Sequence, residues 1–338
     1  MTDLPGLDRS LYPFDSHFHA LPSGHALHFV DEGPASASPV VMVHGNPTWS
    51  FYYRNVIRAL SGERRCLAPD HIGMGLSDRP TDAEYDYTLG QRIEDLGHWL
   101  DSVEPERTID LVVHDWGGAI GLGWAARNPE RIGKLVILNT WAFTIPDDAD
   151  LPKSLAFART PVGAFLIKGF NAFSGLATWM ATASKLPKNV AQGLTAPYRG
   201  GSHRRLATLR FVQDIPLTES DPAWSVLAET ETLLPNLADK PMLFGWGAKD
   251  FVFNDEVLDK WREIFPDPKI EYFEDAGHYV LEDAADRLVP MIRGSSKVSG
   301  TSRSTKFCWS KRSFRTCRIR CERGMTPGSL RCRLIVNP

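Results

Sequence analysis

The chain has 338 residues, of which 43% are hydrophobic and 10% aromatic, enough to bury the core of one large domain with an insertion. Its 38 basic and 41 acidic residues nearly balance, no apolar segment reaches the roughly 20 residues that span a bilayer, and no basic-then-apolar signal peptide begins the chain. We therefore expect a cytoplasmic protein without a membrane span, and the buried character expected of Cys66 fits a reducing compartment.

The first part of the chain predicts strands joined by turns and helices. Residues 17–21 and 26–31 predict antiparallel edge strands, and residues 40–43 and 65–69 predict buried strands. Thr88 caps a predicted helix whose apolar residues face the core. The glycines after the last of these strands lack the phosphate-loop spacing, so we expect an ordinary loop there.

Asp115 occupies the most informative position in the sequence. It follows a β-branched apolar run, residues 108–113, and precedes a glycine-rich helix. A strand, sharp turn and helix of this kind form the elbow that usually presents a nucleophilic serine, so an aspartate there predicts attack on carbon and an ester with the enzyme. Gly117 has the small size that the turn requires, whereas Val113 is larger than expected. The alternative is that Asp115 only caps the helix.

A second loop is expected beside this elbow. The strand at residues 40–43 ends in a turn at Asn46, and loops after neighbouring parallel strands meet at the carboxyl edge of the sheet. The backbone N–H groups of Asn46 and Trp116 are therefore the predicted oxyanion-hole donors. The same two groups would favour the ionised form of Asp115.

The base and its acid are expected later in the chain, in the order nucleophile, acid, histidine. Residues 241–246 predict a strand, and Asp250 lies in the loop that follows it. The last predicted strand ends shortly before His278. We expect Asp250 to orient His278 as the base, because Asp275 is too close in sequence to reach round and the position after the preceding strand is the non-acidic Asn139.

The segment at residues 142–230 is too long for a loop. Prolines interrupt its apolar residues of helical spacing, which predicts several short helices over the nucleophile. Such a cap would exclude water and admit an apolar small-molecule substrate. The apolar positions are Leu155, Phe157, Ala158, Val162, Phe165, Leu166 and Phe170.

Together these motifs, with residues 44–49 and 69–78, resemble the α/β-hydrolase superfamily of the haloalkane dehalogenase type. The resemblance implies a mostly parallel eight-stranded sheet flanked by helices, formed by residues 1–141 and 231–293, with residues 142–230 as a helical cap. It also implies that the side chains of Asn46 and Trp116 donate N–H groups to the departing anion. No clustered Cys or His spacing up to Arg293 suggests a metal, and we expect no cofactor.

Residues 168–174 and 208–217 resemble, more narrowly, the branch that contains the β-lactone decarboxylases of long-chain olefin biosynthesis. This branch is our first choice of function, and it implies association with other enzymes of olefin biosynthesis. A decarboxylase would lose carbon dioxide from the intermediate held on Asp115, whereas a dehalogenase would use His278 to activate water. Attack at the lactone carbonyl, through an anhydride, stays open.

Two other functions have to be weighed. An epoxide hydrolase also uses an aspartate at the elbow, but such enzymes resemble one another in having two cap tyrosines, and residues 142–230 contain only Tyr198. A binding module without turnover would have no need for the complete set of Asn46, Asp115, Trp116, Asp250 and His278.

The composition changes abruptly at residue 294. Residues 294–338, the tail, hold 11 of the basic residues, a single acid and four of the five cysteines. The net charge is therefore near −13 for the body, residues 1–293, and near +10 for the tail. A basic arm for nucleic acid and a cysteine metal site are two interpretations, but the cysteines lack Cys-x-x-Cys spacing and only three aromatic residues accompany the arginines. We expect a disordered extension of altered reading frame, with no nucleic-acid partner.

Overall fold

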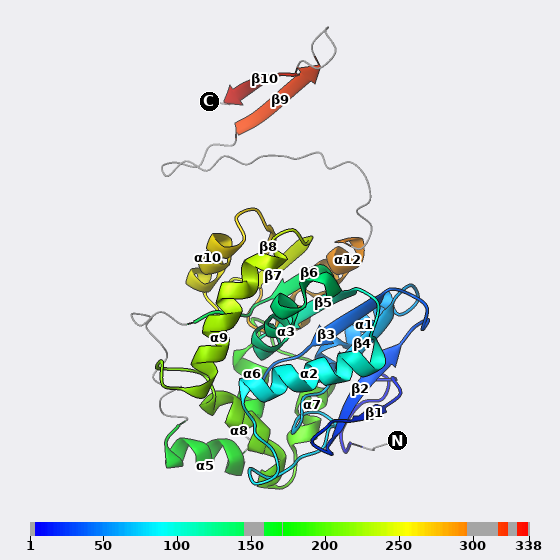
Figure 1. Cartoon of the computed structure of the whole chain (residues 1–338), viewed down its shortest axis with the longest axis vertical. Helices are drawn as coiled ribbons and strands as arrows, with labels where there is room; N and C mark the ends of the chain where they lie inside the picture. The colour runs from blue at the N-terminus through cyan, green and yellow to red at the C-terminus, as the bar shows by residue number, and fades with distance from the viewer. Residues whose placement is uncertain (1–3, 145–158, 171, 296–316, 324–329, 337–338) are drawn as a thin grey trace. The chain divides into compact units, whose positions relative to one another are not determined.

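A computed structural model describes residues 4–144, 159–170, 172–295, 317–323 and 330–336 (Figure 1). The chain divides into two compact units, Met1–Ser296 and Lys297–Pro338. Among the predicted cap positions, Leu155, Phe157 and Ala158 lie outside the described residues.

The first unit is built on one eight-stranded sheet, which confirms the predicted α/β-hydrolase architecture. Its order is β1-β2-β4-β3-β5-β6-β7-β8. β1 and β2 are antiparallel at one edge, and every later pairing from β3·β4 to β7·β8 is parallel. The strands are β1 (His17–Ala20), β2 (Ala26–Glu32), β3 (Pro39–Val43), β4 (Arg65–Pro69), β5 (Ile109–His114), β6 (Ile132–Leu138), β7 (Met242–Gly247) and β8 (Lys269–Phe273).

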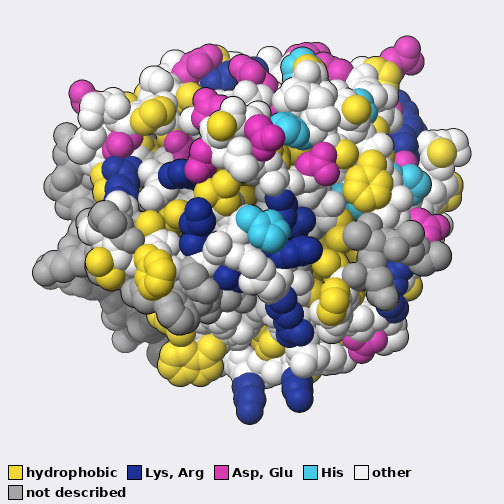
Figure 2. All heavy atoms as spheres, turned by 90° about the horizontal axis from the view of Figure 1, so that it is seen from below, with side chains coloured by type: hydrophobic (Ala, Val, Ile, Leu, Met, Phe, Trp, Pro, Cys, Tyr) yellow, Lys and Arg dark blue, Asp and Glu magenta, His cyan; other side chains and the backbone are white. Residues whose placement is uncertain are grey.

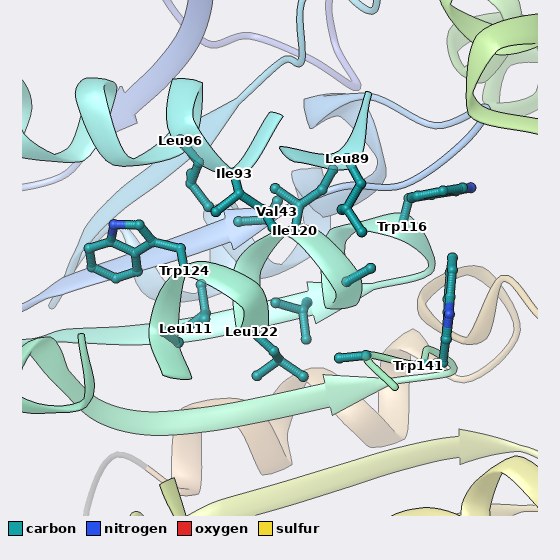
Figure 3. Close-up of a cluster of buried hydrophobic side chains, with 14 of the residues drawn as sticks. Val43, Leu89, Ile93, Leu96, Leu111, Trp116, Ile120, Leu122, Trp124 and Trp141 are labelled. Atoms are coloured by element: carbon teal, nitrogen blue, oxygen red, sulfur yellow. The ribbon is translucent and has the colours of Figure 1, made fainter. Parts of the chain in front are cut away.

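Successive side chains of the central strands supply two cores, one on each face of the sheet. In β5, Leu111 and Val113 join one cluster, and Val112 joins the other. This follows from the two-residue period of a strand, and it explains why the buried strands read as continuous apolar runs. Figure 3 shows part of the first cluster, where Val43 and Leu111 of the sheet meet Ile93 and Ile120 of the covering helices.

Helices cover both faces (Figure 1). One cluster takes residues from α2 (Leu89–Val103), α3 (Trp116–Arg127), α9 (Pro222–Leu233) and α10 (Asp255–Ile264). The other takes residues from α1 (Arg54–Leu60), α11 (Val280–Asp283) and α12 (Ala285–Ser295). Thr88 caps α2 as predicted, because its side chain accepts the N–H of Gln91.

The predicted cap contains short helices separated by turns. They are α5 (Pro161–Phe170), α6 (Ala172–Met180), α7 (Lys188–Thr195) and α8 (Leu206–Gln213). Helix α9 crosses the predicted boundary at residue 230 and packs against α2 and α3 of the core. The end of the cap is therefore shared with the core.

The second unit contains one antiparallel pair in its described part, β9 (Cys317–Arg323) and β10 (Leu330–Val336). The composition predicted a disordered extension here and no strands. Their register places Cys321 opposite Cys332.

Candidate active site

Asp115 stands on a sharp turn between β5 and α3. Its backbone has φ 53° and ψ −131°, a conformation that a non-glycine residue adopts only where the surroundings enforce it. A Cβ on Gly117 would lie 1.9 Å from the carbonyl oxygen of Val43, so the turn needs glycine there. Val113 is accommodated because the residue facing it is Gly121, whose added Cβ would lie 2.7 Å from Val113 Cγ1.

The Asp115 carboxylate makes its hydrogen bond to the neighbouring loop. Oδ1 accepts the backbone N–H of Asn46 at 2.6 Å, and the side chain makes no capping hydrogen bond to α3. A Cβ on Gly45 would lie 2.1 Å from the same oxygen, so the two loops approach as closely as their backbones allow. The carboxylate therefore does not serve as the helix cap that was the alternative to a nucleophile.

The structure brings His278 and Asp250 to this carboxylate, each from the loop after its predicted strand. His278 Nε2 lies 3.5 Å from Asp115 Oδ2, and His278 Nδ1 lies 2.8 Å from Asp250 Oδ2. All three side chains are buried. This is the geometry of a nucleophile, a base and an orienting acid.

The protonation states in this trio are strongly coupled. Burial acts to lower the pKa of His278, but the adjoining Asp250 and Asp115 carboxylates outweigh it and raise that pKa to about 10. Burial acts to raise the pKa of Asp115, but the hydrogen bond and charge of His278 outweigh it and lower that pKa. The resting site is therefore an imidazolium between two carboxylates, with Asp115 ionised.

Asn139 is a supporting residue whose role was not predicted from the sequence. Its side chain donates to Asp250 Oδ2 at 3.0 Å and to the carbonyl of Gly247 at 3.2 Å, and it accepts the N–H of Gly247 at 2.8 Å. Its backbone φ is 28°, which asparagine tolerates better than most residues. The sequence signal for this role was the position of Asn139 directly after β6. We considered that position only as an alternative to Asp250 for the orienting acid.

His114 supports the base from the other side. Its Nε2 lies 2.8 Å from the carbonyl oxygen of His278. Burial and the neighbouring charge of His278 lower the pKa of His114 to about 3, so the ring is neutral and Nε2 carries the proton that it donates. No local sequence pattern indicates this contact, since it joins residues 164 positions apart.

The two residues predicted to receive the departing anion belong to the loops that form this site, since Asn46 bonds to Asp115 through its backbone and Trp116 begins α3. Asn46 Nδ2 donates to the carbonyl of Thr208 at 3.2 Å, which fixes the amide with its second N–H available. The indole N–H of Trp116 makes no hydrogen bond to any residue in the described ranges. Both donors are buried, so a departing anion would meet them away from bulk water.

Aromatic side chains enclose the same region. The Trp116 ring contacts Trp141 at 4.9 Å and Phe211 at 5.2 Å between centroids. Phe253 stacks on Trp141 at 5.3 Å and lies 5.7 Å from the His278 ring. Figure 3 shows the Trp116 and Trp141 rings at the end of the apolar cluster. Such surroundings favour an apolar ligand.

No His, Cys, Asp and Glu group in the described part of the chain is arranged to hold a metal. No described helix is both long and apolar enough to cross a membrane.

The chain is similar to proteins of two named activities. It is 48% identical over 286 residues to a cis-3-alkyl-4-alkyloxetan-2-one decarboxylase of Shewanella oneidensis, covering 84% of this chain and 89% of the relative. A protein of the same name from Xanthomonas campestris is 43% identical, over 80% of this chain and 92% of the relative. Haloalkane dehalogenase 2 of Mycobacterium tuberculosis is 32% identical, over 84% and 96%.

Solved structures agree with this placement. The crystal structure of haloalkane dehalogenase DatA from Agrobacterium tumefaciens has a TM-score of 0.75 and 26% identity, covering 86% of this chain and all of that one. A model of the alpha/beta hydrolase fold matches residues 38–285, which include the elbow, the cap, Asp250 and His278. The chain therefore belongs to the α/β-hydrolase fold family.

Proposed function

We propose that the protein is a β-lactone decarboxylase that converts cis-3-alkyl-4-alkyloxetan-2-ones into alkenes, with Asp115 as nucleophile. The observation that carries this choice is the 48% identity to the Shewanella decarboxylase over most of both chains, against 32% for the dehalogenase relative. The geometry around Asp115 suits both reactions and does not separate them.

The first step is attack of Asp115 on the ring carbon that bears the lactone oxygen. The Asp115–carbon bond forms, the carbon–oxygen bond of the ring breaks, and the ring oxygen departs as a carboxylate. The side chains of Asn46 and Trp116 can each donate a hydrogen bond to it. Asp115 is ionised for this step because His278 holds its pKa low.

The second step needs no water. The bond between the carboxylate carbon and the ring breaks, its electron pair forms the alkene, and Asp115 is expelled with its charge restored. Carbon dioxide and alkene are the only products. The imidazolium of His278, 3.5 Å from Asp115 Oδ2, stabilises the returning carboxylate. Inversion at the attacked carbon followed by anti elimination gives the cis alkene.

Haloalkane dehalogenation is the second candidate, supported by the relatives of that name. Its first step uses the same residues with halide as the departing anion. The ester then has no carboxylate to lose, so release requires water activated by His278 after Asp115 has lost its charge. The substrate's own carboxylate thus decides which path the ester follows.

An epoxide hydrolase fits poorly. Tyr198, the one tyrosine of the predicted cap, is buried and donates its hydroxyl to the carbonyl of Thr48 at 2.9 Å. A hydroxyl used in this way is not free to protonate an epoxide oxygen.

The discriminating experiment offers a long-chain cis β-lactone and a bromoalkane to the enzyme in parallel, with alkene, carbon dioxide, bromide and alcohol measured. We expect alkene and carbon dioxide from the lactone with little bromide from the bromoalkane. Efficient bromide release with alcohol formation would replace the proposal by the dehalogenase. Tight binding of the lactone without consumption would favour a binding module.

Two further parts of the proposal concern the surroundings of the enzyme. By similarity to the decarboxylases, we expect association with other enzymes of olefin biosynthesis, which co-purification from the source organism tests. For residues 294–338 we retain an altered reading frame as the origin of the basic composition. Sequencing of the locus would contradict this if it shows that the reading frame is intact.

A further inference from the structure

The cap segment has a charge opposite to that of the body that carries it. Between Leu151 and Gln213 the chain has nine Lys and Arg residues and no Asp or Glu. The whole of residues 1–293 has 27 basic and 40 acidic residues. The excess of acid therefore lies outside residues 151–213, and this part of the cap is a basic segment on an acidic body.

Five of these cations have no carboxylate partner among the described residues. Arg159 pairs with Asp221 at 3.1 Å and Arg210 pairs with Asp82 at 2.7 Å, while Arg205 is buried and donates to backbone carbonyls. Lys153 lies outside the described residues. The five others are Lys168, Lys185, Lys188, Arg199 and Arg204, and none of them forms an ion pair with a described carboxylate. Figure 2 looks onto this end of the molecule and shows Lys and Arg at its centre and lower edge, with most Asp and Glu in the upper half of the view.

Large apolar side chains are exposed on the same helices. On α5, Val162 is 60% exposed, and on α6, Leu176 is 50%, Trp179 75% and Met180 44% exposed. Helix α6 packs against both α5 and α7, so these residues belong to one continuous part of the cap. Exposed apolar residues grouped in this way mark an interaction surface.

The charged and apolar groups meet at one surface hollow. It lies between α6 and α7, and its lining includes Trp179, Leu186, Lys185 and Lys188. A tryptophan beside lysines on short amphipathic helices is the arrangement that places an indole at the level of lipid headgroups and cations against their phosphates. A partner without apolar groups would not explain why the side chains of Trp179 and Met180 are exposed.

We propose that the outer face of the cap, α5 to α7 with Arg199 and Arg204, docks on an anionic lipid surface. The unpaired cations attract the negative headgroups, and the exposed apolar side chains of α5 and α6 enter the headgroup boundary. The proposal concerns binding alone, so it holds or fails whatever reaction Asp115 performs.

The test uses the full chain with vesicles of phosphatidylcholine alone or with phosphatidylglycerol. Partition is measured by flotation, and lysine acylation footprinting with mass spectrometry reports which lysines the vesicles protect. We expect binding to the anionic vesicles that weakens with salt, with Lys185 and Lys188 acylated several-fold less in their presence and Lys269 unchanged. Residue-level protection is needed because the basic tail could itself attract anionic vesicles.

The variant Lys185→Glu/Lys188→Glu should lose roughly tenfold or more in partition. A matched control, Arg262→Glu/Lys269→Glu, reverses two exposed cations outside the cap and should leave partition near the wild-type value. Trp179→Ala should weaken binding without changing its salt dependence. Three results would overturn the proposal: no binding by the wild type, protection confined to Lys306 and Lys311 of the tail, or equal losses in the cap and control variants.

Discussion

The sheet edge around Asp115 and the outer face of the cap differ in the burial and pairing of their charged groups. At the sheet edge the ionised groups are buried, and each one is held by at least one neighbour of opposite charge or by a hydrogen bond. On the cap face five cations stand without a described carboxylate partner. A buried cluster whose charged groups are paired or hydrogen-bonded is held in one arrangement, which suits a nucleophile. A solvated cationic face is free to meet a second surface.

The largest effect should come from the nucleophile. Asp115→Ala removes the atom that bonds to the substrate, so we expect turnover to fall by about 10⁴-fold or more. Asp110→Asn, at the other end of the same strand, is the control and should change turnover less than threefold. Alkene formation from the cis β-lactone is the measurement. Residual turnover of Asp115→Ala above a hundredth of the wild-type rate would remove Asp115 from the reaction.

Loss of the orienting acid should come next. Asp250→Asn removes a carboxylate that contacts His278 Nδ1, so we expect turnover to fall about 10³-fold and the pKa of His278 to drop. Asn139→Leu removes a bond to Asp250 without removing charge, and we expect about a tenfold loss. Rates and the NMR titration of His278 would check both. An unchanged His278 titration in Asp250→Asn would contradict this assignment.

A smaller effect on kcat should distinguish two neighbouring tryptophans, Trp116 and Trp141. Trp116→Phe deletes an indole N–H proposed to receive the departing carboxylate, so we expect kcat to fall about 10²-fold. Trp141→Phe deletes the N–H of the ring packed edge-on against it, which is buried and without a partner in the described residues, and should change kcat less than threefold. Equal losses in the two variants would point to ring packing and not to anion binding.

The ion pairs of the site should also appear in the pH dependence of stability. The pKa of His278 is raised in the folded protein to about 10, so its contribution is complete below about pH 6.5, the ordinary pKa of histidine, and is lost as the pH rises through 10. The difference in free energy of unfolding between wild type and His278→Gln should therefore shrink over this window, by on the order of 1 kcal/mol or more. Chemical denaturation at several pH values measures it. A constant difference would mean that His278 is not charged in the folded state.

The smallest effect is expected in the cap. Tyr198→Phe removes one hydrogen bond to Thr48, so the free energy of unfolding should fall by about 1 kcal/mol while turnover stays within threefold. Denaturant unfolding and rate measurements check the two halves of this expectation. A large loss of turnover with unchanged stability would instead support a role for Tyr198 in the reaction, as in an epoxide hydrolase.

The same contrast between the two regions governs what the sequence could predict. The elbow, Asp250 and His278 follow strands whose apolar runs are local signals, and the order of parallel strands then places their loops at one edge. The roles of Asn139 and His114 were not predicted, because they consist of contacts to residues 111 and 164 positions away, which no local pattern encodes. In the cap, prolines revealed short helices, but α9 crosses the predicted boundary because its packing on α2 and α3 is a tertiary contact.

One measurement addresses the central claim, that the ester on Asp115 breaks down by loss of carbon dioxide and not by attack of water. The enzyme turns over the cis β-lactone in H₂¹⁸O, and the mass of the peptide that contains Asp115 is then measured by mass spectrometry. Because elimination expels Asp115 with its own two oxygens, we predict alkene and carbon dioxide with no ¹⁸O in the Asp115 carboxylate. Incorporation of ¹⁸O into Asp115 during turnover, with a hydroxy acid as product, would contradict the account.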